Sequence, residues 1–97
     1  MDLERIDLSE RAKRDLVSMS ARRRGYAAGA ITFLADDRIR AKLSVDLYAF
    51  DEEYESDQLG FSTDHIFLAY VEMDDRLIIL HIAGQSPFKP PIRPFPL

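Results

Sequence analysis

Two apolar runs separated by a short acidic segment dominate the second half of the chain. Between residues 65 and 83 the sequence reads HIFLAYVE, then MDDR, then LIILHIA. Asp74 and Asp75 tolerate the backbone angles of a tight turn, so the pattern predicts a β-hairpin in which Met73 pairs with Arg76. This register places Val71 opposite Ile78, Ala69 opposite Leu80 and Phe67 opposite Ile82 on one face, and Tyr70 opposite Ile79 and Leu68 opposite His81 on the other. Because both faces are apolar, we expect the hairpin to be buried on both sides.

The N-terminal part of the chain predicts one amphipathic helix. Its apolar residues recur at spacings of four, four and three between charged positions, at Leu8, Ala12, Leu16 and Met19. Asp7 is placed to cap this helix, and Glu10 follows at the third helical position, as in a capping box. The arginine run at residues 22–24 would then occupy the last turn, where cations suit the helix dipole, and Gly25 would end the helix. We therefore expect the helix over residues 9–24.

Residues 26–50 fit two periods at once. After a connector at residues 26–29, apolar and polar residues alternate from Ile39 to Phe50, which is typical of a half-buried strand. Five apolar residues between Ile31 and Leu47 also lie four apart, as they would on a helix. We favour the strand, preceded by a hairpin turn at Asp36 and Asp37. Three apolar residues would lie on the wrong side of the alternative helix, namely Phe33, Ala41 and Val45.

Together these elements predict an α+β fold in which the N-terminal helix packs on an antiparallel, mainly four-stranded sheet. Ninety-seven residues suffice for one small core, and we expect a single domain over residues 1–86. An extended proline-rich tail follows over residues 87–97, where the chain reads PFKPPIRPFPL. This tail either folds back over the sheet or binds a proline-recognising groove or a neighbouring subunit. Its apolar contacts would come from Phe88, Ile92 and Phe95.

Charge is distributed unevenly along the chain. Residues 1–42 carry a net charge of +3 and residues 43–97 carry −7, which together give −4. The two halves either attract each other within one fold or dock on a charged partner. The candidate acidic partner-binding loop contains Asp51, Glu52, Glu53, Glu55 and Asp57. The candidate basic patch consists of Arg22, Arg23, Arg24, Arg38, Arg40 and Lys42. The acidic remainder of the chain argues against nucleic-acid binding by this patch.

Several chemistries find no support in the sequence. It contains no cysteine, which excludes disulfides, thiolate metal sites and a cysteine nucleophile, and which suits a cytoplasmic protein. The charged N-terminus does not resemble a signal peptide, and the apolar runs are too short to span a membrane. We find no nucleotide-binding, hydrolase, zinc-protease or calcium-loop pattern. His65 and His81 are interpreted as structural, because neither has a carboxylate at a spacing that forces a pair. The sequence thus favours a protein without enzymatic activity, metal or cofactor.

Two segments resemble the ParE/RelE toxin superfamily. Residues 7–16, DLSERAKRDL, resemble its opening strand-to-helix segment, and residues 70–86, YVEMDDRLIILHIAGQS, resemble its final hairpin, with an acidic turn and a following glycine. The family places a helical hairpin between these segments, where the pattern here favours strands, and its ribonuclease members are basic. The gyrase-directed branch ends on a histidine followed by small and charged residues, where this chain has AGQSP at residues 83–87. The resemblance implies a toxin that acts on gyrase or on ribosome-bound mRNA and has an antitoxin partner.

The function that the residues favour is a small non-enzymatic binding protein, a regulator or inhibitor that acts by protein–protein contact. A charged pole and an apolar face of the sheet would make that contact. The alternative is the ParE/RelE-like toxin. One helix can cover only one face of the sheet, so we also expect a homodimer that buries the outer face of the hairpin, with the tail lying over it or crossing to the partner.

Overall fold

The computed structural model describes residues 1–47 and 57–84. The elements in chain order are η1 Leu3–Arg5, β1 Ile6–Leu8, α1 Glu10–Ser18, α2 Ala21–Ala35, α3 Asp37–Leu43, β2 Ser44–Asp46, β3 Gln58–Ser62, β4 Ile66–Met73 and β5 Arg76–Gly84. The strands form one five-stranded sheet in the order β1-β5-β4-β3-β2. The α+β class is therefore confirmed, and so is the packing of the first helix on the sheet. The expected four-stranded antiparallel sheet is corrected to a five-stranded mixed one, because β1 runs parallel to β5.

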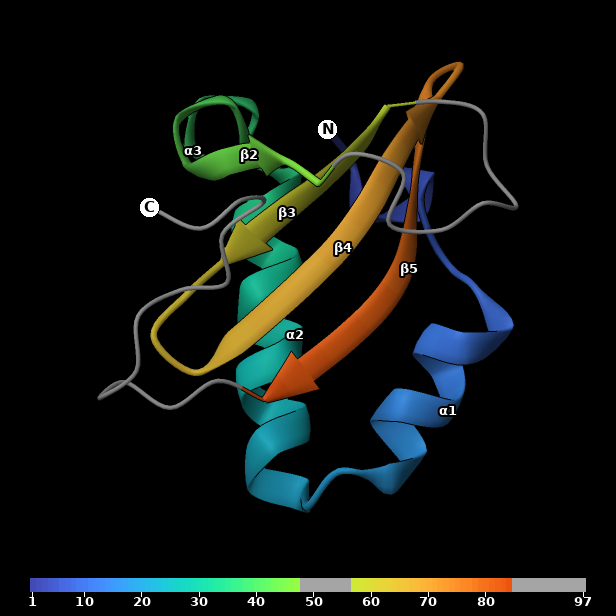
Figure 1. Cartoon of the computed structure of the whole chain (residues 1–97), viewed down its shortest axis with the longest axis vertical. Coiled ribbons are helices and arrows are strands. Elements are labelled where there is room, and N and C mark those ends of the chain that lie inside the picture. Colours follow the sequence, from blue (N-terminus) through green and yellow to red (C-terminus); the bar gives the residue numbers. More distant parts are fainter. Residues whose placement is uncertain (48–56, 85–97) are drawn as a thin grey trace.

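Apolar clusters lie on both faces of the sheet. Tyr70 and Ile79 belong to the cluster that includes Ala12 of α1 and Leu34 of α2. The alternate residues of β4 point to the opposite face and form a second cluster with Leu80 of β5. Figure 1 shows α2 crossing behind β3 and β4, and α1 beside β5. The expected burial of the hairpin on both sides is confirmed, since the six residues from 66 to 71 are all buried.

The predicted hairpin is confirmed at its turn and is wrong beyond a bulge. Met73 pairs with Arg76, and Asp74 has a φ of 56°, a left-handed conformation that aspartate tolerates better than most residues. The register is correct as far as the pair of Tyr70 with Ile79. The ladder then shifts by one residue, and Leu80 is passed over. The pairs observed beyond this point are Ala69 with His81, Leu68 with Ile82 and Phe67 with Ala83.

The predicted helix over residues 9–24 is two helices. Ser9, rather than Asp7, caps α1, and its side chain accepts a hydrogen bond from the Ala12 amide. The chain leaves the helical conformation at Met19, and the Ser20 side chain then caps α2 by accepting from the Arg23 amide. A second capping serine within the apolar pattern therefore splits the helix. Gly25, the expected stop signal, lies inside α2.

The strand expected over residues 39–50 is also wrong, because most of the described part is helical. The connector at residues 26–29 belongs to α2, whose buried residues are Ala27, Ala30, Leu34 and Ala35. Asp36 starts α3 instead of a hairpin, since one carboxylate oxygen accepts from the Arg38 and Ile39 amides. Among residues 39–47, the part of this range that the structure describes, only Ser44–Asp46 form a strand, β2, at the edge of the sheet. Within residues 1–47 and 57–84, no helix is long and apolar enough to cross a membrane.

Candidate functional site

An apolar groove separates α2 from the N-terminal segment of the chain. It has a volume of about 310 Å³ and is lined by Leu3, Ile6, Leu8, Ala28, Ile31 and Thr32. One wall comes from η1 and β1, and β1 is an edge strand of the sheet. The other wall comes from the side of α2 that carries short, exposed side chains at residues 28 and 32. We call this feature the α2–β1 groove. Leu3 lies at its rim and is 54% exposed.

Three exposed arginines, Arg22, Arg23 and Arg24, occupy the first turn of α2. We call them the arginine patch. The Arg22 Nε atom donates to the Tyr26 hydroxyl at 3.0 Å. The Tyr26 ring in turn stacks on the His65 ring, with centroids 4.1 Å apart and an angle of 17° between the planes. Contacts with α2 and with the turn after β3 therefore orient this side of the patch.

The other two arginines of the patch also contact described parts of the fold. The Arg24 guanidinium donates to the Met19 carbonyl at 2.8 Å, at the end of α1. The Arg23 guanidinium lies against Gly84 at the end of β5. Among residues 1–47 and 57–84, no carboxylate forms an ion pair with any arginine of the patch. The cations lie at the positive end of the α2 dipole, and the first turn contains no acidic residue to compensate them.

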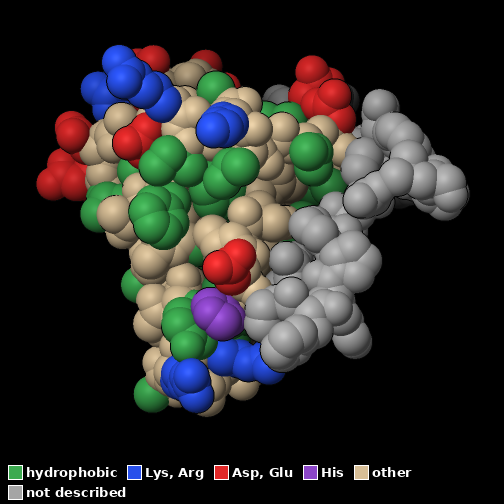
Figure 2. All heavy atoms as spheres, turned by 90° about the vertical axis from the view of Figure 1, so that its left-hand side faces the viewer, with side chains coloured by type: hydrophobic (Ala, Val, Ile, Leu, Met, Phe, Trp, Pro, Cys, Tyr) green, Lys and Arg blue, Asp and Glu red, His purple; other side chains and the backbone are tan. Residues whose placement is uncertain are grey.

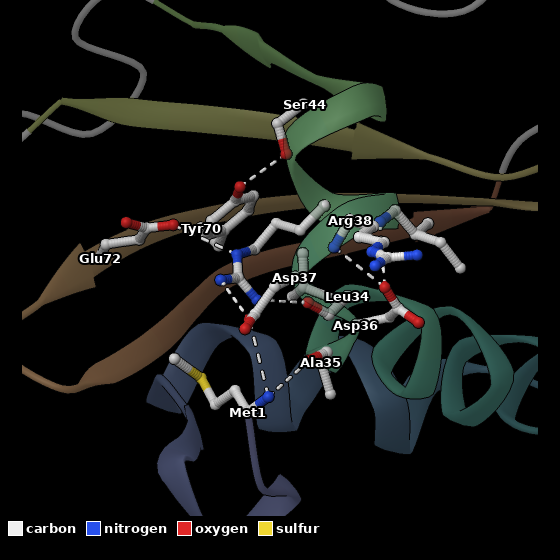
Figure 3. A network of polar contacts seen from close by, with 11 residues as sticks. Met1, Leu34, Ala35, Asp36, Asp37, Arg38, Ser44, Tyr70 and Glu72 are labelled. Carbon is white, nitrogen blue, oxygen red and sulfur yellow. Dashed lines mark hydrogen bonds and ion pairs between the residues drawn. The ribbon is translucent and has the colours of Figure 1, made fainter.

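Arg40, a predicted member of the basic patch, is held in an ion-pair network instead. Its guanidinium donates to Asp37 at 2.8 Å, to Glu72 at 3.2 Å and to the Leu34 carbonyl at 2.9 Å, and its side chain is only 13% exposed. The hydrogen bond from Arg40 also lowers the pKa of the Asp37 carboxyl. Figure 3 shows this network joining α3 to the end of α2 and to β4. Arg40 therefore ties the fold together and is unsuited to bind a partner.

The predicted basic patch does not form one surface. The arginine patch begins α2, whereas Arg38, Arg40 and Lys42 lie on α3, beyond its far end. The twelve helical steps from Arg23 to Ala35 rise by about 18 Å. Figure 2 shows Lys and Arg side chains at the two ends of one face, with hydrophobic side chains between them. The strand face that would have carried Arg38, Arg40 and Lys42 is a helix instead.

His81 has a carboxylate partner that the sequence did not indicate. Its Nδ1 atom lies 2.7 Å from an Asp15 oxygen, and the same oxygen accepts from the Ile82 amide at 2.9 Å. The two residues are 66 positions apart, so no local spacing could reveal the pair. Asp15 occupies the place where a neighbouring strand would bond to β5, because the pairing of β1 with β5 ends at Ile79. We interpret the pair as protection of a strand edge.

Tyr70 and Arg76 complete the polar contacts that support the site. The Tyr70 hydroxyl lies 2.6 Å from the Ser44 hydroxyl, and burial raises the pKa of Tyr70. Arg76 donates to both oxygens of Asp7, at 2.7 and 2.9 Å, which joins β5 to β1. These hydrogen bonds lower the pKa of the Asp7 carboxyl and raise that of Arg76. Asp7, which was expected to cap a helix, instead forms an ion pair with Arg76. This ion pair holds β1, one wall of the groove, against β5.

No family model, curated protein or solved structure matches this chain. Of the predicted acidic loop, Asp57 is exposed, and the other four members lie outside the described residues, as do Phe88, Ile92 and Phe95 of the tail. The part of the chain that the structure describes contains no group of three or more side chains arranged to hold a metal ion.

The sequence identified the arginines of the site and missed its groove. The arginine run was visible as three consecutive letters, although it was assigned to the wrong end of a helix. Leu3, Ala28 and Thr32 carried no signal, because they become one surface only when β1 docks beside β5 and α2 lies over the sheet.

Proposed function

We propose that this protein is a small non-enzymatic binding protein, a regulator or inhibitor, which contacts a protein partner through the α2–β1 groove. The observation that carries this proposal is the groove itself, an open pocket lined by five apolar residues and one threonine, with no charged side chain. Apolar side chains of a partner would displace water from such a surface, which favours association. The sequence has no cysteine, which supports a cytoplasmic setting for that contact.

The groove admits a polypeptide segment better than a rigid flat surface. Ala28 and Thr32 are short, so the backbone of a partner can approach α2 closely. Leu3 stands at the opposite rim with 54% of its surface exposed, and it would be covered by the same segment. A partner with apolar side chains on one face of a helix or strand fits this shape.

Two matched substitutions test the proposal. Proteins captured by the tagged full chain are identified, purified and titrated against Ala28→Glu, which places a carboxylate in the groove, and against Ala41→Glu, which places one on an exposed site of α3. We expect at least a tenfold loss of affinity, which corresponds to about 1.4 kcal/mol, for the groove variant alone. Equal affinity of wild type and Ala28→Glu would refute the assignment of the groove.

The homodimer expected from the sequence stays a prediction within this proposal. Phe67, Ala69, Val71 and Leu80 on the outer face are each at most 2% exposed in the single chain, so their burial does not require a second copy. Light scattering on the full chain and on a version that ends at Ser86 tests the prediction. A monomer that stays soluble without the tail would contradict it.

One observation favours the toxin as a second candidate. The two helices α1 and α2 lie between the opening strand β1 and the later strands, whereas the sequence pattern had favoured strands in part of that interval. A helical hairpin at this position is what the resemblance to the ParE/RelE superfamily implies. The parallel pairing of β1 with β5 also brings the two resembling segments together.

Expression in bacteria separates the two candidates. A toxin is expected to arrest growth, and a co-encoded antitoxin is expected to relieve the arrest. A binding protein of the first kind is expected to be tolerated at the same level of expression. Harmless overexpression of the folded chain would count against the toxin.

A further inference from the structure

The arginine patch differs from Arg40 and Arg76 in having no carboxylate partner among residues 1–47 and 57–84. Arg40 and Arg76 each bond to carboxylates at 2.7 to 3.2 Å. The patch has no such ion pair among the described residues, and its three cations share the positive end of the α2 dipole. Repulsion among the cations and with the dipole would be relieved by an anion from outside. The patch therefore fits an anionic group of a partner.

Arg24 places one edge of the arginine patch next to the α2–β1 groove, whereas Arg22 and Arg23 lie further round the start of α2. Arg24 precedes Ala28, a wall residue of the groove, by four positions, so the two lie on the same side of the helix, separated by a rise of about 6 Å. A polypeptide segment in the groove would need only one or two further residues to reach the Arg24 guanidinium, and its end would continue round the start of α2 toward Arg23 and Arg22. The apolar and the basic surface can therefore be contacted by one segment.

Carboxylates fit this patch better than a nucleic acid does. Guanidinium groups bind carboxylates with two parallel hydrogen bonds, and a few carboxylates on a mostly apolar segment would match both surfaces. A nucleic acid would instead bring a long row of phosphates toward a chain with a net charge of −4. It would also leave the apolar groove without a complementary group.

We propose that the segment that fills the α2–β1 groove is an apolar peptide segment with clustered aspartate or glutamate residues at the end that reaches Arg22, Arg23 and Arg24. This inference rests on the proposed binding function and specifies the chemistry of the partner. The apolar part would supply most of the affinity. The acidic end would set the direction of the segment in the groove and increase the association rate.

Selection of peptides on the intact protein tests the proposal without a known partner. A phage-displayed library of random peptides is selected on the full chain, and the enriched peptides are synthesised. Each is titrated against wild type, against a variant that combines Arg22→Gln, Arg23→Gln and Arg24→Gln, and against Ala28→Glu. Glutamine keeps a similar helix propensity and a polar hydrogen-bonding end while removing the charge. Thermal melts establish that each variant is folded.

We expect the enriched peptides to combine apolar residues with an acidic cluster at one end. Their affinity should fall about tenfold or more on the glutamine variant, since three partly exposed ion pairs contribute modest energies that add. Binding should also become less sensitive to salt. Affinity should fall on Ala28→Glu as well.

Distinct failures separate this inference from the function on which it rests. Some peptides could bind Ala28→Glu more weakly than wild type but bind the glutamine variant with normal affinity. This result would refute the proposed acidic end of the segment and would leave the groove as the binding site. Peptides unaffected by Ala28→Glu, or no enrichment at all, would overturn both. Binding of a fluorescent oligouridylate at about 0.15 M salt, abolished in the glutamine variant, would assign the patch to phosphate and overturn the peptide.

Discussion

Substitution of Asp15 tests how the free edge of β5 is held. The pairing of β1 with β5 ends where Leu8 meets Ile79. Beyond that point, residues at the start of α1 and within it form the hydrogen bonds to the backbone of β5. The Ser9 hydroxyl donates to the Leu80 carbonyl at 3.0 Å, and the Asp15 carboxylate accepts from the Ile82 amide at 2.9 Å. Asp15→Ala removes the acceptor of that amide and a carboxylate that contacts His81.

The magnitude follows from the two contacts. A hydrogen bond to a charged group contributes about 1.5–3 kcal/mol, and a buried amide left without an acceptor costs about as much. The Asp15 side chain is 22% exposed, so water recovers part of this energy. We expect Asp15→Ala to lower the free energy of unfolding by about 2–3 kcal/mol, and Asp15→Asn, which keeps an oxygen acceptor, by about 1 kcal/mol.

Urea unfolding measures the stability change, and hydrogen exchange of the Ile82 amide reports the contact directly. Asp46→Ala, which removes an exposed carboxylate from the edge strand β2, is the control and should change stability by less than about 0.5 kcal/mol. A double cycle with His81→Ala should give a coupling energy of about 1 kcal/mol. If Asp15→Ala were as stable as the control, or if exchange of the Ile82 amide were unchanged, the carboxylate would not secure this edge.

Three further predictions concern packing, the α2 terminus and alkaline pH. Gly60→Ala should lower the free energy of unfolding by about 1 kcal/mol, because the new Cβ would lie 2.9 Å from Leu47 and 3.0 Å from Phe67. Gly29→Ala should instead stabilise α2, because the new Cβ would have no neighbouring atom within 4 Å. Equal urea midpoints of the two variants would contradict this contrast. Arg23→Glu should raise the free energy of unfolding by about 1 kcal/mol, because the glutamate can form a capping box with Ser20 at the positive end of α2. The same variant should bind acidic peptides more weakly. A melting temperature below that of wild type would refute the electrostatic argument. The raised pKa of buried Tyr70 means that the unfolded state loses its proton first, so stability should fall as the pH rises above 10.0. Tyr70→Phe should remove that part of the alkaline loss and cost about 1 kcal/mol at neutral pH, and an unchanged alkaline slope of the unfolding free energy would contradict the assignment.

The local pattern of the sequence was sufficient for the hairpin turn and insufficient for the region before it. Asp74 and Asp75 lie between two apolar runs, and the turn forms where the pattern placed it. The apolar residues between 31 and 47 fit both the period of two of a strand and the spacing of four of a helix. The choice between strand and helix depended on the surface against which these residues pack. Ala30 and Leu34 bury one face of α2 against the sheet, and Asp36 caps α3, so packing and capping select the helices.

Capping set the place of the arginine run in its helix, whereas tertiary structure alone formed the groove near it. The run of three arginines at residues 22–24 is compatible with the end of one long helix and with the start of a second. The Ser20 cap makes it the start of α2, at the positive end of the helix dipole. The groove needs β1 beside β5, a contact between residues about 70 positions apart in the chain. The pair of Asp15 and His81 depends on the same docking. Periodicity and capping are local and can be read from neighbouring residues, whereas these contacts form only when distant segments gain more from shared burial than they lose in chain entropy.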